Sequence, residues 1–426
     1  MKSKIGLPLA WSQPFITLLL FLLAKKFGGG GLHLSWLTVS QMVSLLGSTL
    51  LAISFILSGR WRFVEDWFGG MDKVYKNHHL FGGLAFVFLL HHPLLLILDV
   101  LPDLNFSRNY LWFSNFAPYN WGILSLYAMM LMLIFTLLLN LPYSLWKKTH
   151  EFMGFALLFA SLHVLTITSD VSRFLPLRLW LIFLLLVAGY SVIYRRFLYR
   201  YLGPKYTYVV KNIRKINDLY DIDMVPSDKK LHFTAGQFVF TRFEAISGEA
   251  HPFSLASGPD EESLRIVVKI LGDYTWRFDS VKSGSRVVLW GPYGKFGEGV
   301  VGDKPLIWVA GGIGVTPFLS LLAAEIKNQK PRQIDIFYCV GSEKEAVFDE
   351  ELKTLSSQKA GVTFHRYPSD VCGHLDAHKL IELCDGVVGK KIMLCGPISM
   401  MNSLTLQLKA VGVRNQDIIF EDFNFK

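Results

Sequence analysis

Long apolar runs separated by short polar segments fill the first 200 residues of the chain. Six of these runs can each hold roughly 16–20 mostly apolar residues, about the length that a helix needs to cross a bilayer. The pattern predicts six membrane spans, near residues 7–24, 38–57, 77–98, 121–141, 150–168 and 177–195. We therefore expect a six-helix transmembrane bundle over residues 1–200.

Beyond residue 200 the hydrophobic pattern shortens to the two-residue period of a strand. Apolar and polar residues alternate at 206–210, 237–242, 264–270 and 286–290, with Gly and Pro turns between them. This pattern predicts a small antiparallel β-barrel over 201–302. Strands and helices alternate afterwards, with strands near 305–310, 334–340, 362–367, 391–395 and 417–421. That order is typical of an open parallel α/β sheet, which we expect over 303–426.

The distribution of charge supports a membrane location. Residues 1–200 hold 16 Lys/Arg and 7 Asp/Glu, whereas residues 201–426 hold 27 of each, so the net charge of +9 lies beside the apolar runs. This placement indicates a lipid bilayer as partner and argues against nucleic acid. If both termini are cytosolic, eleven cations lie in inner loops and five in outer loops, as the positive-inside rule requires. We expect a multi-pass membrane protein with cytoplasmic termini.

Six histidines lie within two of the predicted spans, where ionisable side chains are costly and indicate function: His78, His79, His91, His92, His150 and His163. In the span at 77–98, the pairings His78–His91 and His79–His92 are 13 residues apart and about 140° from the same face, so we choose His78 and His92. His78 and His92 are 14 residues apart, about 21 Å along a helix and about 40° from the same face. His150 and His163 are 13 residues apart, so either their helix is locally distorted or they approach their ligands from different sides. Imidazole pairs facing across a bundle suit axial coordination of haem iron. The pattern predicts two haems, against the simpler interpretation of histidines hydrogen-bonded within the bundle.

A predicted strand at 305–310 runs directly into a glycine-rich turn and then a helix. The turn reads Gly311-Gly312-Ile313-Gly314-Val315-Thr316-Pro317. Glycines at the carboxyl end of a strand let a pyrophosphate approach backbone N–H groups at a helix N-terminus. A second turn, Leu394-Cys395-Gly396-Pro397, follows another predicted strand, and by the switch-point rule both turns face one nucleotide. An ordinary pair of tight turns is the competing interpretation.

The residues that follow the second α/β strand bear on the choice of nucleotide. Ser342 and Lys344 suit the 2′-phosphate of NADPH, whereas Glu343 is the kind of acid that holds ribose hydroxyls in NAD sites. Arg366 is a further cation, although a solvated surface residue is its simpler interpretation. We expect NADPH, with NADH as the alternative.

The second half of the chain resembles the ferredoxin–NADP reductase family, in which a flavin barrel precedes a nicotinamide-binding domain. The resemblance is carried by His251–Leu255, Val268–Thr275, Gly291–Gly294, the two glycine turns and Glu421–Phe425. It implies that FAD is bound by His251, Pro252, Phe253, Ser254, Lys269, Gly272, Asp273, Tyr274 and Thr275. It implies that the nucleotide is bound by Gly311, Gly312, Gly314, Thr316, Gly396 and Pro397, with Cys395 on the nicotinamide side.

The end of the chain resembles the terminal Glu-x-Phe segment of that family, whose aromatic ring shields the flavin. The resemblance implies that Phe423 takes this role and lies, with Cys395, at the place of hydride transfer. Phe425 is the rival position. A phenylalanine that merely packs in a core or along an edge strand is the competing interpretation.

The first half resembles the ferric-reductase-type transmembrane domain, and together the resemblances cover roughly residues 38–426. The matching segments are Lys73–His78, His92-Pro93, His150 and His163. Compact bacterial NADPH oxidases of the NOX type and bacterial ferric reductases share this architecture. The resemblance implies that electrons pass from cytosolic NADPH to FAD, to an inner b-type haem (His78, His150) and to an outer one (His92, His163).

The terminal acceptor is the remaining choice. Molecular oxygen, reduced to superoxide, is the acceptor in NOX-type oxidases, and the uncharged aromatic segment 110–121 would exclude bulky iron chelates. That segment is equally well an interfacial aromatic belt. A ferric chelate reductase, or an electron donor to a quinone or an extracytoplasmic protein, are the alternatives. Short predicted outer loops argue against an obligatory protein partner.

Overall fold

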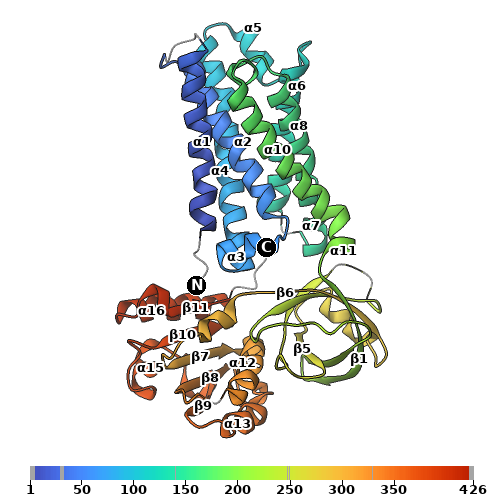
Figure 1. The fold of residues 1–426 in the computed structure, drawn as a ribbon, viewed down its shortest axis with the longest axis vertical. Coiled ribbons are helices and arrows are strands. Elements are labelled where there is room, and N and C mark those ends of the chain that lie inside the picture. Colours follow the sequence, from blue (N-terminus) through green and yellow to red (C-terminus); the bar gives the residue numbers. More distant parts are fainter. Residues whose placement is uncertain are drawn as a thin grey trace. The chain divides into compact units, whose positions relative to one another are not determined.

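The structure is a computed structural model that describes residues 5–28, 33–139, 141–246, 248, 250–328 and 330–421. The chain divides into two compact units, with the boundary between Tyr199 and Arg200. The first unit is helical and the second holds two β-sheets (Figure 1).

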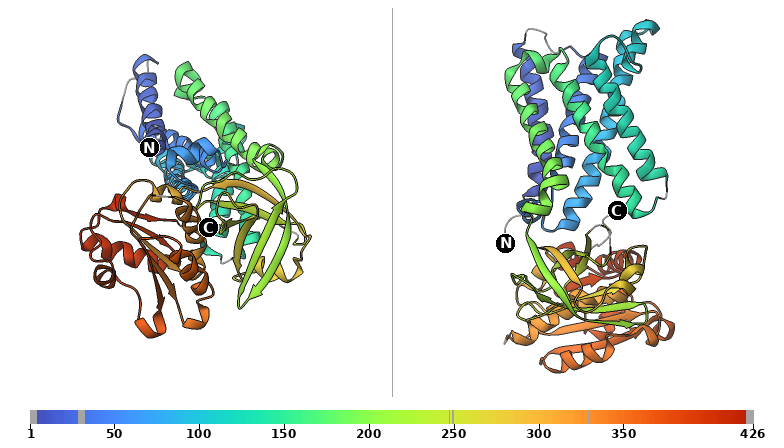
Figure 2. Two further views of the ribbon diagram at one scale, coloured as in Figure 1. Left: turned by 60° about the horizontal axis from the view of Figure 1, so that its bottom comes forward. Right: turned by 90° about the vertical axis from the view of Figure 1, so that its right-hand side faces the viewer.

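Helices that run alongside one another build the first unit (Figures 1 and 2). The longer ones are α1 (Gly6–Phe27), α2 (Trp36–Leu57), α4 (Met71–Val100), α6 (Ala117–Leu133), α8 (Met153–Thr166) and α10 (Leu175–Ile193). Shorter ones are α3 (Arg62–Phe68), α5 (Leu104–Ser107), α7 (Tyr143–Glu151) and α9 (Asp170–Arg173). Helix α11 (Tyr199–Leu202) contains the boundary between the two units. Large apolar side chains such as Phe15, Phe183 and Leu186 are more than half exposed on the outside of the bundle. An apolar exterior of this kind is suited to lipid.

Five helices of the described residues, not the expected six, are long and apolar enough to cross a membrane. The expected span at 150–168 is divided at Phe152 into α7 and α8. Lys147, Lys148 and Glu151 make α7 polar, so the apolar part is left to α8, whose 14 residues rise about 21 Å. That rise is shorter than a hydrocarbon core of about 30 Å.

A buried polar contact joins three helices of the bundle. The hydroxyl groups of Thr17 on α1 and Thr49 on α2 lie 2.9 Å apart. The indole N–H of Trp180 on α10 donates to the Thr17 hydroxyl over 2.9 Å. Hydrogen bonds between helices within a membrane contribute about 0.6 kcal/mol on average and up to ~2 kcal/mol.

An antiparallel sheet that closes on itself begins the second unit. Its strands are β1 (Lys205–Ile216), β2 (Leu219–Pro226), β3 (Phe238–Phe243), β4 (His251–Ser254), β5 (Leu264–Lys269) and β6 (Arg286–Tyr293), in the order β4-β3-β6-β1-β2-β5. A β-bridge between Leu255 and Ile266 joins the two ends of this order. Tyr208, Phe243 and Phe278 fill the interior. The expected barrel-like domain is confirmed.

A parallel sheet follows, as the strand–helix alternation predicts. It consists of β7 (Leu306–Gly311), β8 (Ile334–Val340), β9 (Val362–Pro368), β10 (Lys391–Cys395) and β11 (Ile418–Phe420), in the order β11-β10-β7-β8-β9. Helices α12 (Thr316–Lys327) and α13 (Asp349–Ser357) pack on one face. Helices α15 (Ala377–Leu383) and α16 (Ile398–Ala410) pack on the other (Figure 1). Strand β10 returns beside β7, so the order reverses there and creates a switch point.

An arginine ties the barrel to the α/β domain. The Nε atom of Arg265 on β5 donates to Asp221 of β2 over 2.7 Å, and its Nη1 donates to Glu351 of α13 over 2.5 Å. The side chain of Asp221 is 3% exposed and that of Arg265 is 17% exposed. Two-pronged arginine–carboxylate pairs of this kind fix orientation as well as adding energy.

Replacing Arg265 by alanine is expected to destabilise the second unit by about 2–3 kcal/mol, because the buried Asp221 carboxylate loses its main partner. Arg214 also pairs with Asp221, but its side chain is 59% exposed, so Arg214→Ala should cost less than about 1 kcal/mol. The shift in thermal unfolding of the purified full-length variants measures both. Equal shifts in the two variants would contradict the assignment.

Candidate functional site

Four histidines meet in two pairs inside the helical unit. The ring centroids of His78 on α4 and His150 on α7 lie 6.2 Å apart. Those of His92 on α4 and His163 on α8 lie 6.3 Å apart. The two pairs are 14 residues apart along α4, which corresponds to about 21 Å.

The turn at Phe152 accounts for the 13-residue spacing that did not suit a straight helix. His150 belongs to α7 and His163 to α8, and the helix is interrupted between them at Phe152. The sequence left two explanations open, a local distortion of the helix or an approach of the two histidines from different sides. The structure shows a local distortion at Phe152. The helix face on which His150 lies is therefore set independently of the face on which His163 lies.

The ring nitrogen Nδ1 of three of these histidines faces a backbone carbonyl oxygen. The distances are 2.8 Å from His78 to Ser54, 3.1 Å from His92 to Ser40 and 2.8 Å from His163 to Pro118. A carbonyl oxygen only accepts, so Nδ1 carries the hydrogen and Nε2 keeps its lone pair. The Nε2 atoms of these three histidines are thus in the form that binds a metal ion. The Nδ1 atom of His150 lies 3.5 Å from the Thr136 hydroxyl oxygen.

The neighbouring histidines differ. His91 is exposed, and its Nδ1 lies 2.7 Å from the carbonyl oxygen of Val87 on its own helix. His79 is also exposed. On α4, His78 and His92 each meet a partner ring, whereas the adjacent His79 and His91 are exposed.

A cavity of about 230 Å³ lies against the His92–His163 pair. Its surface is mainly apolar and includes Leu89 and Met129, and the polar residues that also line it include Tyr110, Tyr119 and Asp170. Gln41 also lines it, and its side-chain oxygen is buried without a hydrogen-bond partner among the described residues. A buried polar atom without a partner indicates that a further polar group would supply its missing hydrogen bond.

Two of the predicted flavin-binding segments come together in the barrel. The ring of His251 on β4 stacks on that of Tyr274, with centroids 3.7 Å apart, and burial raises the pKa of Tyr274 to about 12. The Thr275 hydroxyl accepts the N–H of Gly272 over 3.0 Å, so it stabilises the turn that presents Tyr274. Lys269 lies 3.4 Å from Asp218.

The two glycine turns meet at the switch point of the parallel sheet. A Cβ atom at Gly314 would collide with the carbonyl oxygen of Cys395, and one at Gly311 would lie 2.7 Å from Pro397. Gly312 has a φ of +52° and no other group within 4 Å of where a Cβ would be. The close approach requires glycine, and the open backbone at Gly312 can receive a phosphate. Thr316 begins the following helix.

Cys395 and Glu421 lie near one another at the ends of β10 and β11. Cys395 is fully buried, and burial together with the nearby Glu421 carboxyl group raises the pKa of its thiol well above the ordinary value. A Cβ at Gly294 would lie 2.9 Å from the Glu421 carboxylate and 3.0 Å from Phe238, the strand partner of Ser254. The structure thus adds Glu421 to the predicted set; the Glu-x-Phe pattern was the signal for it. Phe423 and Phe425 lie outside the described residues.

The loop after β8 is held by two contacts. Asn217 of the barrel donates to the backbone carbonyl of Lys344 over 3.2 Å. Arg366 on β9 lies 3.1 Å from Glu343, so the acid that argued against NADPH has a cation beside it. Ser342 donates towards Glu345 over 3.4 Å.

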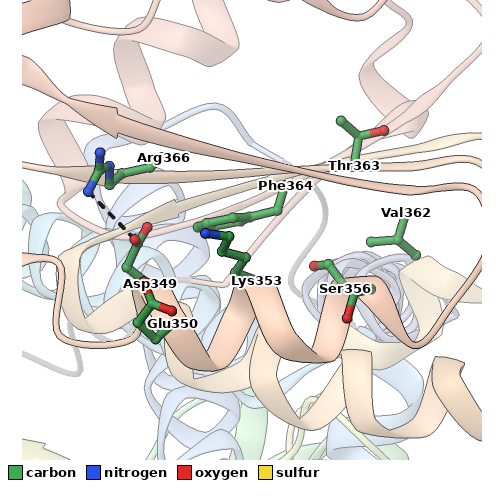
Figure 3. Close-up of a pocket in the computed structure, with 9 residues that line it drawn as sticks. Asp349, Glu350, Lys353, Ser356, Val362, Thr363, Phe364 and Arg366 are labelled. Atoms are coloured by element: carbon green, nitrogen blue, oxygen red, sulfur yellow. Dashed lines mark ion pairs between the residues drawn. The ribbon is translucent and has the colours of Figure 1, made fainter.

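An open hollow of about 500 Å³ lies between α13 and the edge strand β9 (Figure 3). Asp349 and Arg366 point toward one another there, 3.6 Å apart. Lys353 and Phe364 lie beside them. None of the residues predicted to bind a cofactor lines this hollow.

Comparison with curated proteins and solved structures finds several proteins similar to parts of this chain. The chain is 29% identical over 186 residues to flavohemoprotein A of Dictyostelium discoideum, covering 40% of this chain and 46% of that protein. It is 27% identical over 222 residues to one subunit of the Na⁺-translocating NADH-quinone reductase of Klebsiella pneumoniae, covering 43% of this chain and 52% of that subunit. The chain thus spans about half the length of these curated relatives. A flavohemoglobin structure from Malassezia yamatoensis with bound FAD and heme shares the fold at a TM-score of 0.53 and 18% identity, covering 92% of this chain and all of that one.

Three family models match in succession. The ferric reductase like transmembrane component matches residues 43–161, the FAD-binding domain residues 207–297 and the oxidoreductase NAD-binding domain residues 308–405. The first covers three of the four paired histidines and ends just before His163, and the other two cover most of the barrel and of the parallel sheet. The chain is therefore a multi-pass membrane oxidoreductase with the domain architecture of NOX-type oxidases and ferric reductases, in which a ferric-reductase-type membrane domain precedes a ferredoxin–NADP reductase-type module.

Proposed function

We propose that the protein carries electrons from cytosolic NADPH through FAD and two b-type haems to molecular oxygen on the outer face, producing superoxide. The observation that carries the proposal is the pairing of His78 with His150 and of His92 with His163. Each pair presents two imidazoles to one another inside an apolar bundle.

The residues present fit a haem in each pair. Two iron–nitrogen bonds of about 2 Å and two ring radii of about 1.2 Å separate the ring centroids of a bis-histidine iron by about 6.4 Å. The observed separations are 6.2 and 6.3 Å. Among the described residues, no group of three or more His, Cys, Asp or Glu side chains is placed to hold a metal ion. Paired imidazoles therefore suit a porphyrin iron, which takes two ligands from the protein.

The other parts of the chain supply binding and orientation. When bound, FAD takes a hydride from the nicotinamide and releases electrons singly, and each haem iron carries one at a time. The backbone at Gly312 would hold the pyrophosphate of the nucleotide, and His251 with Tyr274 would hold FAD. We propose that the nicotinamide meets the flavin beside Cys395 and Glu421, which lie near one another at the ends of β10 and β11. Protonated Cys395 adds no negative charge at that place.

We infer that both termini are cytosolic and that α8 returns the chain across the membrane. The histidine pairs are separated by about 21 Å along α4, and α7 and α8 supply one histidine to each pair, so they must cover the same distance.

We propose NADPH as the donor, because Ser342 and Lys344 follow β8 and Arg366 balances Glu343. Oxygen as acceptor is supported by the largely apolar cavity beside the His92–His163 pair, which suits a small neutral molecule. Trp112 and Phe113, in the aromatic segment 110–121, are exposed and uncharged. A ferric chelate reductase is the second candidate, favoured by the family model that covers most of the membrane domain. Transfer to a quinone or an extracytoplasmic protein is the third.

Replacing His92 by alanine is expected to remove one haem and so to halve the haem-to-FAD ratio of the purified protein. NADPH should still reduce the flavin, because that step takes place in the second unit. His91→Ala is the matched control, since His91 is adjacent and faces outward. The reduced-minus-oxidised absorbance of both variants gives the haem content. Two haems retained in His92→Ala would refute the assignment.

The acceptor is tested by NADPH-driven reduction of cytochrome c in air, with and without superoxide dismutase. Reduction that dismutase abolishes is the expected result, because superoxide would be the carrier. Dismutase-insensitive or absent reduction, together with fast anaerobic reduction of ferric chelates, would instead establish a metal reductase.

A further inference from the structure

Two serines of α2 meet the two α4 histidines in the same way. On α2, Ser40, Gly47 and Ser54 recur every seven residues. On α4, His78, Ala85 and His92 recur at the same interval. Seven residues are nearly two full turns, so each set lies along one face of its helix. The two faces meet with Ser54 at His78 and Ser40 at His92.

Each serine makes a double contact with its histidine. The Ser54 hydroxyl lies 2.9 Å from Nδ1 of His78 and donates to the His78 backbone carbonyl over 3.2 Å. The Ser40 hydroxyl lies 2.7 Å from Nδ1 of His92 and donates to the His92 carbonyl over 2.8 Å. Because each hydroxyl hydrogen is directed to a carbonyl, the hydroxyl oxygen accepts from Nδ1. The N–H of each imidazole is thus shared between the hydroxyl and carbonyl oxygens of one serine.

Close packing of the two helices makes this contact possible. A Cβ at Gly47 would lie 2.8 Å from Leu89, and one at Gly82 would lie 3.2 Å from the Ser54 hydroxyl. Ser40 is fully buried and Ser54 is 4% exposed. A buried hydroxyl without a partner is costly, so both serines are held to this geometry.

We propose that Ser40 and Ser54 are positioning residues that fix the tautomer, the ring orientation and the basicity of His92 and His78. This inference rests on the proposed function, since it requires these histidines to be haem ligands. An acceptor on Nδ1–H makes the imidazole a stronger donor to iron and favours the oxidised metal. Removing the acceptor is therefore expected to raise the reduction potential of that haem.

The contact distances predict unequal effects at the two positions. At His92 the Ser40 hydroxyl is the nearer acceptor, at 2.7 Å against 3.1 Å for the carbonyl. At His78 the Ser54 carbonyl is nearer, at 2.8 Å against 2.9 Å for the hydroxyl. Replacement by alanine removes only the hydroxyl. Ser40→Ala should therefore perturb its haem more than Ser54→Ala.

The test measures Ser40→Ala and Ser54→Ala in the full-length protein by haem-to-FAD ratio, low-temperature EPR of the ferric haems and redox titration. In Ser40→Ala we expect one haem to change its EPR g-values and to rise in potential, with about tenfold weaker haem retention. Ser54→Ala should change the other haem in the same direction and by less. Ser40→Thr should restore the wild-type signals, because it keeps a hydroxyl at the same position.

Thr49→Val is the matched control. Thr49 is equally buried on α2, and its hydroxyl bonds to Thr17 instead of a histidine. It should lower stability without altering either haem signal. If Ser40→Ala cannot be purified, Ser40→Cys, of nearly the same size and with a weaker acceptor, is measured in its place.

Unchanged g-values and potentials in both serine variants would overturn the inference. A change as large in Thr49→Val would also overturn it, since loosened packing would then be the cause. A wild-type protein without haem, or His92→Ala with two haems, would instead show that the proposed function itself has failed.

Discussion

Every imidazole placed inside a lipid-surrounded bundle needs an acceptor for its N–H, because no water is available to supply one. This requirement organises the membrane unit. The carbonyl groups of Ser40, Ser54 and Pro118 meet it from neighbouring helices. A carbonyl oxygen that already accepts a hydrogen bond within its own helix can accept a second one from a side chain on another helix. This requires the backbones of the two helices to be close. The small residues on α2 and α4 provide that proximity, as small residues do between membrane helices generally.

In the second unit, close approach also depends on small residues, but there the groups that must be left accessible belong to the backbone. Two turns must approach one another at the switch point and still leave peptide N–H groups open to a dinucleotide. Gly311 and Gly314 permit the approach, and Gly312 leaves the opening. Arg265 then holds the barrel against the α/β domain. Arg265 between two carboxylates, the contact of Asn217 with Lys344 and a continuous apolar core thus join the flavin-binding and nucleotide-binding segments.

Features of local origin could be predicted from the sequence. Apolar length located the long helices, and the strand–glycine–helix order located the dinucleotide turns, because each depends on neighbouring residues. The 13-residue spacing of His150 and His163 allowed a local distortion of their helix, but it did not place the division at Phe152. The serine residues that contact His78 and His92 could not be predicted either. The seven-residue spacing of Ser40, Gly47 and Ser54 is visible in the sequence, but nothing in it says which helix that face meets. Arg265 and Glu421 gain their importance from residues distant in the chain.

Because the helix is interrupted at Phe152, the two parts of the bundle that supply the paired histidines differ: α4 is one continuous helix, whereas α7 and α8 are two. Helix α4 is continuous from Met71 to Val100, so it alone sets the spacing between the two pairs. One residue inserted between His78 and His92 would rotate one imidazole by about 100° relative to the other. The same insertion beside Phe152 would fall where the helix is already interrupted between α7 and α8. An added residue therefore disturbs the spacing of the two histidine pairs more when it lies in α4 than when it lies at this interruption.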